Sequence, residues 1–187
     1  MVNITIDGKK VQVRANMTIM EAAAQCGIPI PKLCYLKGIN EIAACRVCVV
    51  ELEGKDRLIT SCNNVAKEGM VIYTNSPKVR RNRRTTVELI LSQHDSNCVS
   101  GKRSGNCSLQ TVANDLNIID IPFKMEIGKQ AWDKQFPLIR DSSKCIKCMR
   151  CVQVCEKVQG LGIWDVEGTG TWTTVNVAGH KSISEAD

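Results

Sequence analysis

Residues 33–52 read LCYLKGINEIAACRVCVVEL, and three of the chain's eleven cysteines fall within this stretch. With one cysteine further on they follow the spacing C-x10-C-x2-C-x13-C, formed by Cys34, Cys45, Cys48 and Cys62. Soft thiolates select zinc, copper(I) or iron-sulfur cores. The residues around the central pair are small, which suits backbone N–H groups that approach inorganic sulfide. A zinc ribbon usually pairs two C-x-x-C knuckles and this spacing has one, so an iron-sulfur cluster is predicted, with structural zinc as the alternative.

A second cysteine run, KCIKCMRCVQVCE at residues 144–156, has the spacing C-x2-C-x2-C-x3-C. In bacterial ferredoxins the first three thiolates of such a run hold one 4Fe-4S cluster and the fourth holds its neighbour. We therefore predict a 4Fe-4S cluster with ligands among Cys145, Cys148, Cys151 and Cys155. No second run of this kind follows before Asp187. Two alternatives stay open: Cys155 joins the local cluster, or the missing ligand lies beyond the end of this chain.

A third segment, HDSNCVSGKRSGNC at residues 94–107, holds one histidine and two cysteines among small polar residues. His94, Cys98 and Cys107 cannot by themselves close a tetrahedral metal site. The purpose of this segment therefore has to be inferred together with the other cysteines.

The eleven cysteines are interpreted as thiolate ligands in a reducing compartment rather than as a disulfide scaffold. Their number is odd, several fall in tight C-x-x-C steps, and the start MVNITIDGKKVQV lacks the apolar core of a signal peptide. We therefore expect a cytoplasmic protein. No run approaches the roughly 18 apolar residues of a membrane span, so no membrane insertion is expected.

The formal net charge of +6 raises a nucleic-acid hypothesis, and the densest basic patch is PKVRRNRR at residues 77–84. That charge count treats every cysteine as neutral, whereas thiolates around iron-sulfur cores add negative charge. We therefore expect no nucleic-acid partner. The basic run is interpreted as the solvated face and beginning of a helix, or as a docking patch for an acidic partner.

The N-terminal pattern predicts a hairpin and then a helix. NITIDGKKVQVR alternates apolar and polar residues on either side of Asp7-Gly8, which is typical of two strands joined by a tight turn. Thr18 followed three residues later by Glu21 forms a capping box, and Gly27 stands where the helix should end.

Two strands and two helices are predicted next. VVELEG at residues 49–54 and GMVIYTN at 69–75 indicate strands, and the resulting order fits a mixed sheet wrapped over one helix. From Pro77 onward the apolar spacing is that of an amphipathic helix, and SLQTVANDL at 108–116 predicts a second short one. An irregular connector then carries Pro122, Gly128 and Pro137.

Taken together, LCY...ACRVCVVEL...SC, then HDSNC...NC, then DSSKCIKCMRCVQVCEKVQGLG resemble the N-terminal electron-transfer region of iron-only hydrogenases and of the large subunit of respiratory complex I. The resemblance covers nearly the whole chain. It implies an α+β fold with a β-grasp 2Fe-2S ferredoxin domain, a small helical His/Cys domain and a half bacterial-ferredoxin-like 4Fe-4S domain. The corresponding boundaries are residues 1–78, 79–118, a connector over 119–137, and 138–187.

The resemblance also explains the segment at residues 94–107. In this family one histidine and three cysteines hold a 4Fe-4S cluster in the pattern H-x3-C-x2-C-x5-C. His94, Cys98 and Cys107 match three of these positions, and Gly101 stands in place of the remaining cysteine. The segment resembles a His-ligated cluster site that has lost a ligand, which a serine hydroxyl, water or an outside group could replace.

The function implied by the resemblance is an electron relay without a catalytic centre of its own, since the hydrogen-activating domain of the family is absent from these residues. A 2Fe-2S and a 4Fe-4S cluster would pass single electrons between a flavin/NAD(P)H-binding iron-sulfur subunit and a second low-potential site, ferredoxin or hydrogen. The expected assembly is a hetero-oligomer like the bifurcating hydrogenases of anaerobes. The alternatives are the N-terminal fragment of a catalytic iron-only hydrogenase subunit and a zinc-stabilised interaction module.

Five remaining features receive structural interpretations. Cys26 is expected to be a small buried hydrophobe, and His180 a solvated side chain. Trp164 and Trp172 are expected to pack in the ordinary way, with shielding of the adjacent cluster as the alternative. Gly168-Thr169-Gly170 follows no clear strand and is interpreted as a turn rather than a nucleotide site.

Overall fold

A five-stranded sheet forms the N-terminal part of the computed structural model, which describes residues 1–99, 101, 103–123, 125–127, 132 and 136–186. The strands and α-helices are, in chain order, β1 (Val2–Ile6), β2 (Lys9–Val13), α1 (Ile19–Gln25), β3 (Val49–Leu52), β4 (Ile59–Thr60), β5 (Val71–Tyr73), α2 (Pro77–Leu91), α3 (Ser108–Asp115), α4 (Arg150–Val154), β6 (Trp164–Glu167) and β7 (Thr174–Val177). Short 3-10 turns cover Ser142–Lys144, Gly170–Trp172, Ala178–His180 and Ile183–Glu185, and a π-helical turn covers Cys155–Gln159. Gly128, part of the expected connector, and Asp187 lie outside the described residues.

The predicted hairpin is confirmed. Strands β1 and β2 pair antiparallel, with Ile6 opposite Lys9 at the closed end. Asp7 and Gly8 form the two-residue turn with φ values of 47° and 82°. Both values lie in the left-handed region, which a turn of this length needs to match the twist of its strands.

The sheet is mixed, as the sequence predicts. Its strand order is β2-β1-β5-β3-β4, in which β1 and β5 run parallel and the other neighbours antiparallel. Strand β4 was not predicted, because two residues are too few to display an alternating pattern. It pairs with β3 and so extends the sheet beside the cysteine loop.

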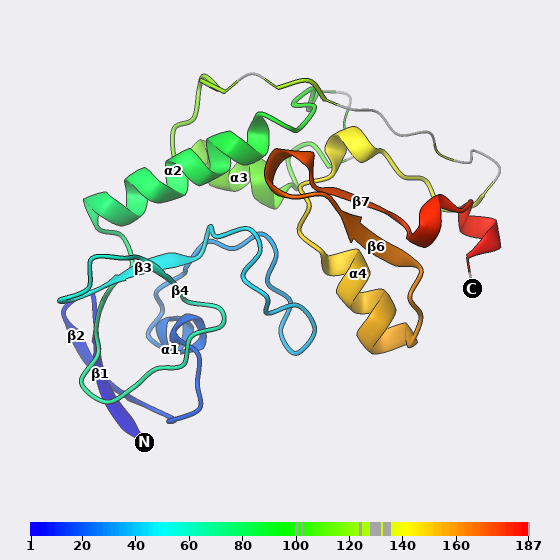
Figure 1. Cartoon of the computed structure of the whole chain (residues 1–187). Helices are drawn as coiled ribbons and strands as arrows, with labels where there is room; N and C mark the ends of the chain where they lie inside the picture. The colour runs from blue at the N-terminus through cyan, green and yellow to red at the C-terminus, as the bar shows by residue number, and fades with distance from the viewer. Residues whose placement is uncertain (100, 102, 124, 128–131, 133–135, 187) are drawn as a thin grey trace.

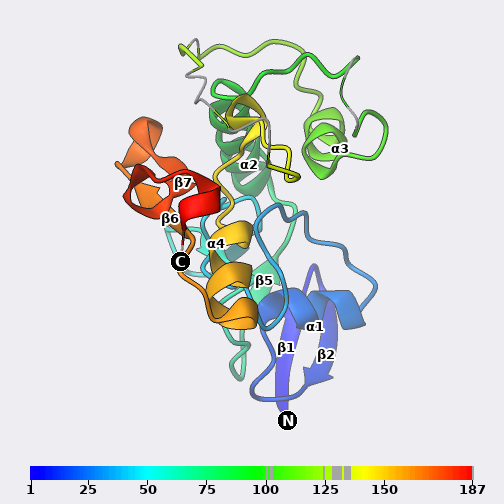
Figure 2. The same ribbon diagram turned by 90° about the vertical axis from the view of Figure 1, so that its right-hand side faces the viewer.

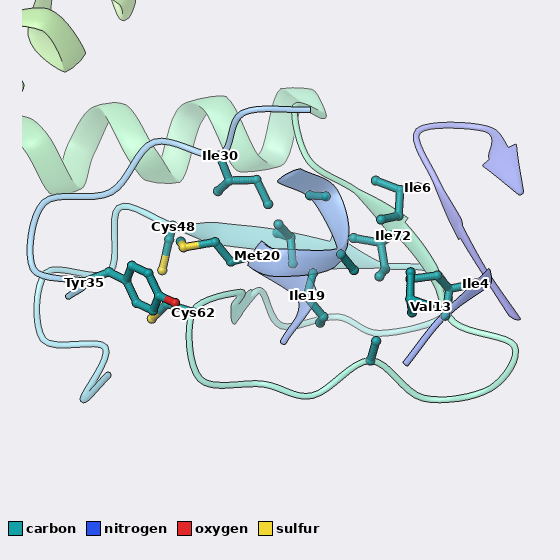
Figure 3. Packing of buried hydrophobic residues seen from close by; sticks show 14 of the residues in the cluster. Ile4, Ile6, Val13, Ile19, Met20, Ile30, Tyr35, Cys48, Cys62 and Ile72 are labelled. Carbon is teal, nitrogen blue, oxygen red and sulfur yellow. The ribbon is translucent and has the colours of Figure 1, made fainter. Parts of the chain in front are cut away.

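Helix α1 packs on one face of this sheet and completes the first hydrophobic core (Figure 3). Its predicted capping box is present: Glu21 N–H donates to Thr18 Oγ1 at 3.2 Å, and Thr18 N–H donates to Glu21 Oε2 at 3.1 Å. Gly27 follows the helix with φ of 71°, as expected of a C-terminal cap. Figure 3 shows Cys48 and Cys62 at the end of this core, beside Tyr35. Two of the cysteine thiols therefore form one end of the first hydrophobic core.

Helices α2 and α3 lie above the sheet, with α2 in contact with both β3 and α3 (Figures 1 and 2). Ser76 caps α2 by accepting a hydrogen bond from Val79 N–H at 3.2 Å, and Pro77 occupies the first turn, where its missing N–H costs nothing. Both predicted helices are therefore present. Among the described residues, no helix combines the length and the apolar character needed to cross a bilayer.

The C-terminal part consists of α4, its π-helical extension and the β6–β7 hairpin (Figure 1). The expectation that no strand precedes Gly168 was wrong, because β6 ends at Glu167 immediately before it. The four residues WDVE do alternate apolar and polar side chains, but the strand is short and its exposure does not follow that alternation. Gly168, with φ of 71°, does lie in the turn between the strands.

Of the two tryptophans expected to pack in the ordinary way, Trp164 does and Trp172 does not. The Trp164 ring stacks on Trp132 with centroids 5.9 Å apart, and the Arg140 guanidinium lies over both rings. Trp172 is 81% exposed and so provides little shielding. His180 is largely exposed and pairs with Glu167 at 2.9 Å.

Candidate metal centres

Four thiols converge at the end of the first core. They are the residues of the C-x10-C-x2-C-x13-C spacing, with exposed fractions of 1%, 9%, 1% and 0% for Cys34, Cys45, Cys48 and Cys62. Their sulfurs form two hydrogen-bonded pairs, Cys34 with Cys45 and Cys48 with Cys62. The structure thus brings together all four residues that the sequence singled out. All eleven cysteines are free thiols, and Cys26 is half-buried against the first core.

The protonation of these thiols shows what kind of group fits between them. The hydrogen bond from Cys34 lowers the pKa of Cys45 to about 5, and the bond from Cys62 lowers the pKa of Cys48 to about 7. The pKa of each donor shifts the other way. The same hydrogen bonds, together with burial, raise the pKa of Cys34 and of Cys62. Four buried sulfurs can all become thiolates only around a cationic group. The donor set therefore fits an iron-sulfur core.

The loop that carries Cys45 is bent toward this site. Ala43 and Arg46 have φ values of 56° and 55°, which non-glycine residues adopt rarely and at a cost of about 1–3 kcal/mol each. The bend lets the backbone N–H of Val47 donate to the Cys45 sulfur, which further favours the thiolate. A loop bent in this way directs N–H groups at sulfur, as iron-sulfur ligation requires.

Arg83 holds the same loop from behind and was missed by the sequence interpretation. It was counted in the solvated face of α2, but it is only 5% exposed. Its guanidinium donates to three backbone carbonyls, those of Val47 at 2.9 Å, Val49 at 3.0 Å and Thr74 at 3.2 Å. Burial lowers its pKa from the ordinary value. Arg83 therefore fixes the backbone on either side of Cys48.

The second cysteine run begins directly after the 3-10 turn Ser142–Lys144 and continues through α4, with Cys151 in α4 and Cys155 at the start of the π-helical turn. The exposure of the thiols changes along the run: Cys145 and Cys148 are half-buried, Cys151 is exposed and Cys155 is buried. The first three are neighbours, since Cys145 and Cys148 both act electrostatically on the Cys151 thiol. Lys147 and Met149 have left-handed φ values of 54° and 61°, and Lys147 N–H donates to the Cys145 sulfur at 3.4 Å. This loop therefore also directs an N–H group at sulfur.

The third set of residues surrounds the end of α2 and the beginning of α3. His94 is half-buried, and burial lowers the pKa of its imidazole, which favours the neutral form that binds metals. Its buried Nδ1 has no hydrogen-bond partner among the described residues. Cys98 and Cys107 are half-buried, and Gly101 N–H donates to the Cys98 carbonyl at 3.0 Å. Within the described ranges, no group of three or more His, Cys, Asp or Glu side chains is arranged to hold a single metal ion.

The His94 loop is fastened to the segment that leads into the second cysteine run. Lys144 donates to the carbonyl of Asp95 at 2.6 Å and of Asn97 at 3.2 Å, and it pairs with the Asp95 carboxylate at 3.2 Å. Asp95 N–H in turn donates to the carbonyl of Ser143 at 2.9 Å. The second and third sets therefore share one rigid support.

The first and second sets are joined by Asn40 and Arg150, which sequence reasoning also missed. Asn40 is fully buried, and its amide nitrogen donates to the carbonyl of Cys34 at 2.9 Å and of Cys148 at 2.8 Å. Arg150 donates to the carbonyls of Cys34 at 3.0 Å and Tyr35 at 2.8 Å. No local sequence signal marks either residue, because each acts on backbone more than a hundred positions away.

A second hydrophobic core has cysteines of all three sets in it or against it. Cys34 and Cys45 of the first set are buried in it with residues of α2 and α3, and the half-buried Cys107 and Cys148 of the other two sets pack against it. The three candidate centres are therefore packed around one shared interior.

Two family models match the chain. Residues 1–77 match the 2Fe-2S iron-sulfur cluster binding domain, and residues 83–122 match the NADH-ubiquinone oxidoreductase-G iron-sulfur binding region. Together these domains bind a 2Fe-2S cluster and a 4Fe-4S cluster. The fold and its thiol sites thus define an iron-sulfur protein of mixed α and β structure, and the predicted kinds of cofactor are confirmed.

Individual proteins similar to this chain narrow the class of iron-sulfur protein further. It is 42% identical over its full length to the NADP-reducing hydrogenase subunit HndD of Solidesulfovibrio fructosivorans, of which it covers 33%. It is 33% identical, over 94% of its length, to the NADH-ubiquinone oxidoreductase 75 kDa subunit of Reclinomonas americana, of which it covers 26%. The chain is therefore similar, over nearly its whole length, to the iron-sulfur regions of these hydrogenase and complex I proteins, as the sequence resemblance indicated.

A solved structure shows the same fold over the whole chain. The crystal structure of an NAD+-reducing nickel-iron hydrogenase in the H2-reduced state contains a chain that superposes with a TM-score of 0.87 at 26% identity. The match covers 99% of the present chain and 79% of that chain. The HoxS gamma polypeptide of the NAD-reducing hydrogenase of Cupriavidus necator is 29% identical over 94% of the chain, which covers 75% of that polypeptide.

Proposed function

We propose that this chain is an iron-sulfur relay, which passes single electrons between a flavin-bearing, NAD(P)H-oxidising partner and a second low-potential redox site, either ferredoxin or hydrogen. Bound iron-sulfur clusters supply one-electron redox chemistry, and the protein supplies their spacing and surroundings. The named relatives are components of hydrogenases and of NADH-ubiquinone oxidoreductase, which supports a hetero-oligomeric oxidoreductase.

The proposed domains follow the sequence boundaries. A β-grasp 2Fe-2S domain over residues 1–78 is supported by the mixed sheet that wraps α1. A helical His/Cys domain over 79–118 comprises α2 and α3, and a connector over 119–137 leads to a half ferredoxin-like domain over 138–187. Since α2 begins at Pro77, the first boundary falls where a helix starts.

The proposed ligands are assigned by set. The 2Fe-2S cluster is held by Cys34, Cys45, Cys48 and Cys62, and a 4Fe-4S cluster by Cys145, Cys148 and Cys151. We assign Cys155 to that same cluster or to a neighbouring one. His94, Cys98 and Cys107 form a degenerate third site, to which Gly101 contributes no side chain.

One observation carries the proposal: cysteines of all three sets lie in the second hydrophobic core or pack against it. Electrons cross a protein over short distances only, so a relay needs its centres packed around common elements. The amide bridge of Asn40, from Cys34 to Cys148, joins the first and second sets directly. Such a bridge has little purpose in a protein whose sites act separately.

The chain's own residues prepare the first site for its cluster. Val47 N–H donates to sulfur, while Arg83 and Ser61 hold the backbone on either side. Burial of all four thiols excludes water, which is one of the means by which a protein sets a cluster's potential.

The test is metal analysis of anaerobically purified protein. We expect iron and acid-labile sulfide for at least one 2Fe-2S and one 4Fe-4S cluster, with matching low-temperature EPR signals. Cys48→Ser should remove the 2Fe-2S signal, whereas Cys26→Ser, which changes a cysteine outside every run, should leave the iron content unchanged. Stoichiometric zinc with iron near zero would instead support the interaction-module alternative.

A second candidate is the N-terminal part of a catalytic hydrogenase polypeptide. It is favoured by the match to HndD, of which this chain covers a third. The relay role would be the same in that case. Detection of a longer gene product that carries a further C-x2-C-x2-C-x3-C run would decide for this candidate.

A further inference from the structure

A groove with a volume of about 810 Å³ runs along the outer side of α2. The α2 residues that line it are spaced three and four positions apart from Lys78 to Ile90, so they form one continuous helix face. Figure 1 shows α2 extending from above the five-stranded sheet toward the C-terminal hairpin. The groove therefore spans the two parts of the chain that carry the first and second cysteine sets.

Both cysteine loops reach this groove. Cys45 and Arg46 of the first loop line it together with Cys145 and Lys147 of the second. Each loop also places one cationic residue in the groove beside its cysteine. These residues, Arg46 and Lys147, both have a left-handed backbone, with φ of 55° and 54°. A molecule seated in the groove would contact both loops at once.

The groove is strongly basic. Five cationic residues line it, against one acidic residue among those described, Asp56. The five are Arg46, Arg57, Lys78, Arg81 and Lys147. All except the half-buried Lys147 are exposed. Like charges gathered around a concave surface reinforce one another's potential and attract an anionic partner.

Part of the groove's lining is apolar. Leu58, Leu89, Ile90 and Ile146 contribute to that part, and among the described lining residues there is no aromatic side chain. Apolar side chains beside charged ones are typical of a protein interface. Binding of single-stranded nucleic acid usually needs aromatic rings on which bases stack. The lining therefore favours a protein partner.

We propose that this groove is the docking surface for an acidic redox protein, which it places against the loops of both cysteine sets. The proposal rests on the proposed relay function and deepens it, because it names the surface and the charge of the partner. The basic side chains recruit the partner by long-range attraction, and the apolar lining residues bury its contact residues.

The experiment compares two adjacent arginines of α2 in the anaerobically purified, cluster-containing protein. Arg81 lines the groove, whereas Arg80 does not and donates to the Asn75 carbonyl at 2.7 Å. The probe is an acidic ferredoxin, with association rates measured at low salt. Arg81→Glu should slow association about tenfold or more, the lower end of electrostatic steering, while Arg80→Glu should stay close to the wild type.

Salt supplies an independent measurement. Binding to the wild-type protein should weaken steeply between about 0.1 M and 1 M salt, since the screening length falls from about 10 Å to about 3 Å. If Arg81→Glu fails to fold, Arg57→Glu in the turn before β4 tests the same groove from outside the helix. Circular dichroism of each variant establishes whether it folds.

Three results would overturn the docking proposal: equal slowing by Arg80→Glu and Arg81→Glu, no ferredoxin binding at low salt, or tighter binding of an oligonucleotide than of ferredoxin. Visible absorption and EPR separate this failure from failure of the relay. A protein without iron-sulfur signals would contradict the proposed function itself. If the Arg81→Glu variant carries its full set of clusters and still binds ferredoxin as well as the wild type does, only the docking surface is contradicted.

Discussion

The side-chain amide of Asn40 donates a 2.8 Å hydrogen bond to the backbone carbonyl of Cys148, 108 positions further along the chain. The same nitrogen donates to the carbonyl of Cys34, so one buried side chain serves a cysteine of the first set and a cysteine of the second. Arg150, which lies within the second cysteine run, also donates to the Cys34 carbonyl. Hydrogen bonds from the side chains of Asn40 and Arg150 thus fix the relative position of the two thiol loops.

Replacing Asn40 with leucine keeps its approximate size and removes both donors. The Cys148 carbonyl, in a part-buried contact, then loses its bond from Asn40, and we expect the free energy of unfolding to fall by about 1–3 kcal/mol. Chemical denaturation under anaerobic conditions measures this change. The matched control is Asn82→Leu on the exposed face of α2, which should stay within about 0.5 kcal/mol of the wild type. Equal stability of the two variants would show that the bridge is not structural.

Arg83→Met should destabilise the N-terminal domain more than any other single arginine replacement in the basic run. It preserves the apolar stem but leaves buried carbonyls of Val47, Val49 and Thr74 without their donor. The expected loss exceeds about 2 kcal/mol, since each unsatisfied buried group costs about 1–3 kcal/mol. Arg80→Met, on the exposed side of the same helix, is the control. If the free energy of unfolding fell less in Arg83→Met than in Arg80→Met, water would have to replace the guanidinium as the donor to these carbonyls.

Gly101→Cys should restore the missing ligand of the third set and add about one 4Fe-4S cluster, or roughly four iron atoms per chain. A Cβ at this position would lie 3.2 Å from the Cys98 carbonyl, a tight contact that a small shift of the loop can relieve. Iron and sulfide analysis after anaerobic reconstitution measures the gain. Ser104→Cys adds a cysteine outside the family spacing and should add no iron. Equal iron in both variants would contradict the proposed repair.

Glu21→Gln should remove an ion pair while keeping the helix cap, because glutamine can still complete a capping box. The hydrogen bond with Lys37 is the main cause that lowers the pKa of Glu21. A lowered folded-state pKa means that the ion pair stabilises the protein above the unfolded pKa of about 4.3 and that this gain is lost as pH falls through the folded value. We expect a difference of at most about 1 kcal/mol near neutral pH, because solvent screens the pair. Thermal unfolding of both proteins from neutral to acidic pH should show this difference closing, and a constant difference would contradict the ionic origin.

The features predicted correctly from sequence are those whose causes lie within a few residues. The turn at Asp7-Gly8 and the cap at Thr18 are determined by neighbours, and the cysteine spacing predicted the four buried thiols that converge at the end of the first core. Asn40 and Arg83 could not be recognised in this way. Their partners lie far along the chain, and an arginine among other arginines gives no sign that it points inward.

The second core has a consequence for how the protein matures. Cysteines of three sets lie in it or against it, so on the proposed ligand assignment a newly made chain that had received only one cluster would still have an unfinished interior. Metal delivery and folding would then proceed as a single coupled event, since binding at one centre completes surfaces on which the others pack. Oxygen damage at one centre would accordingly loosen its neighbours, and repair would require the whole chain to be refilled.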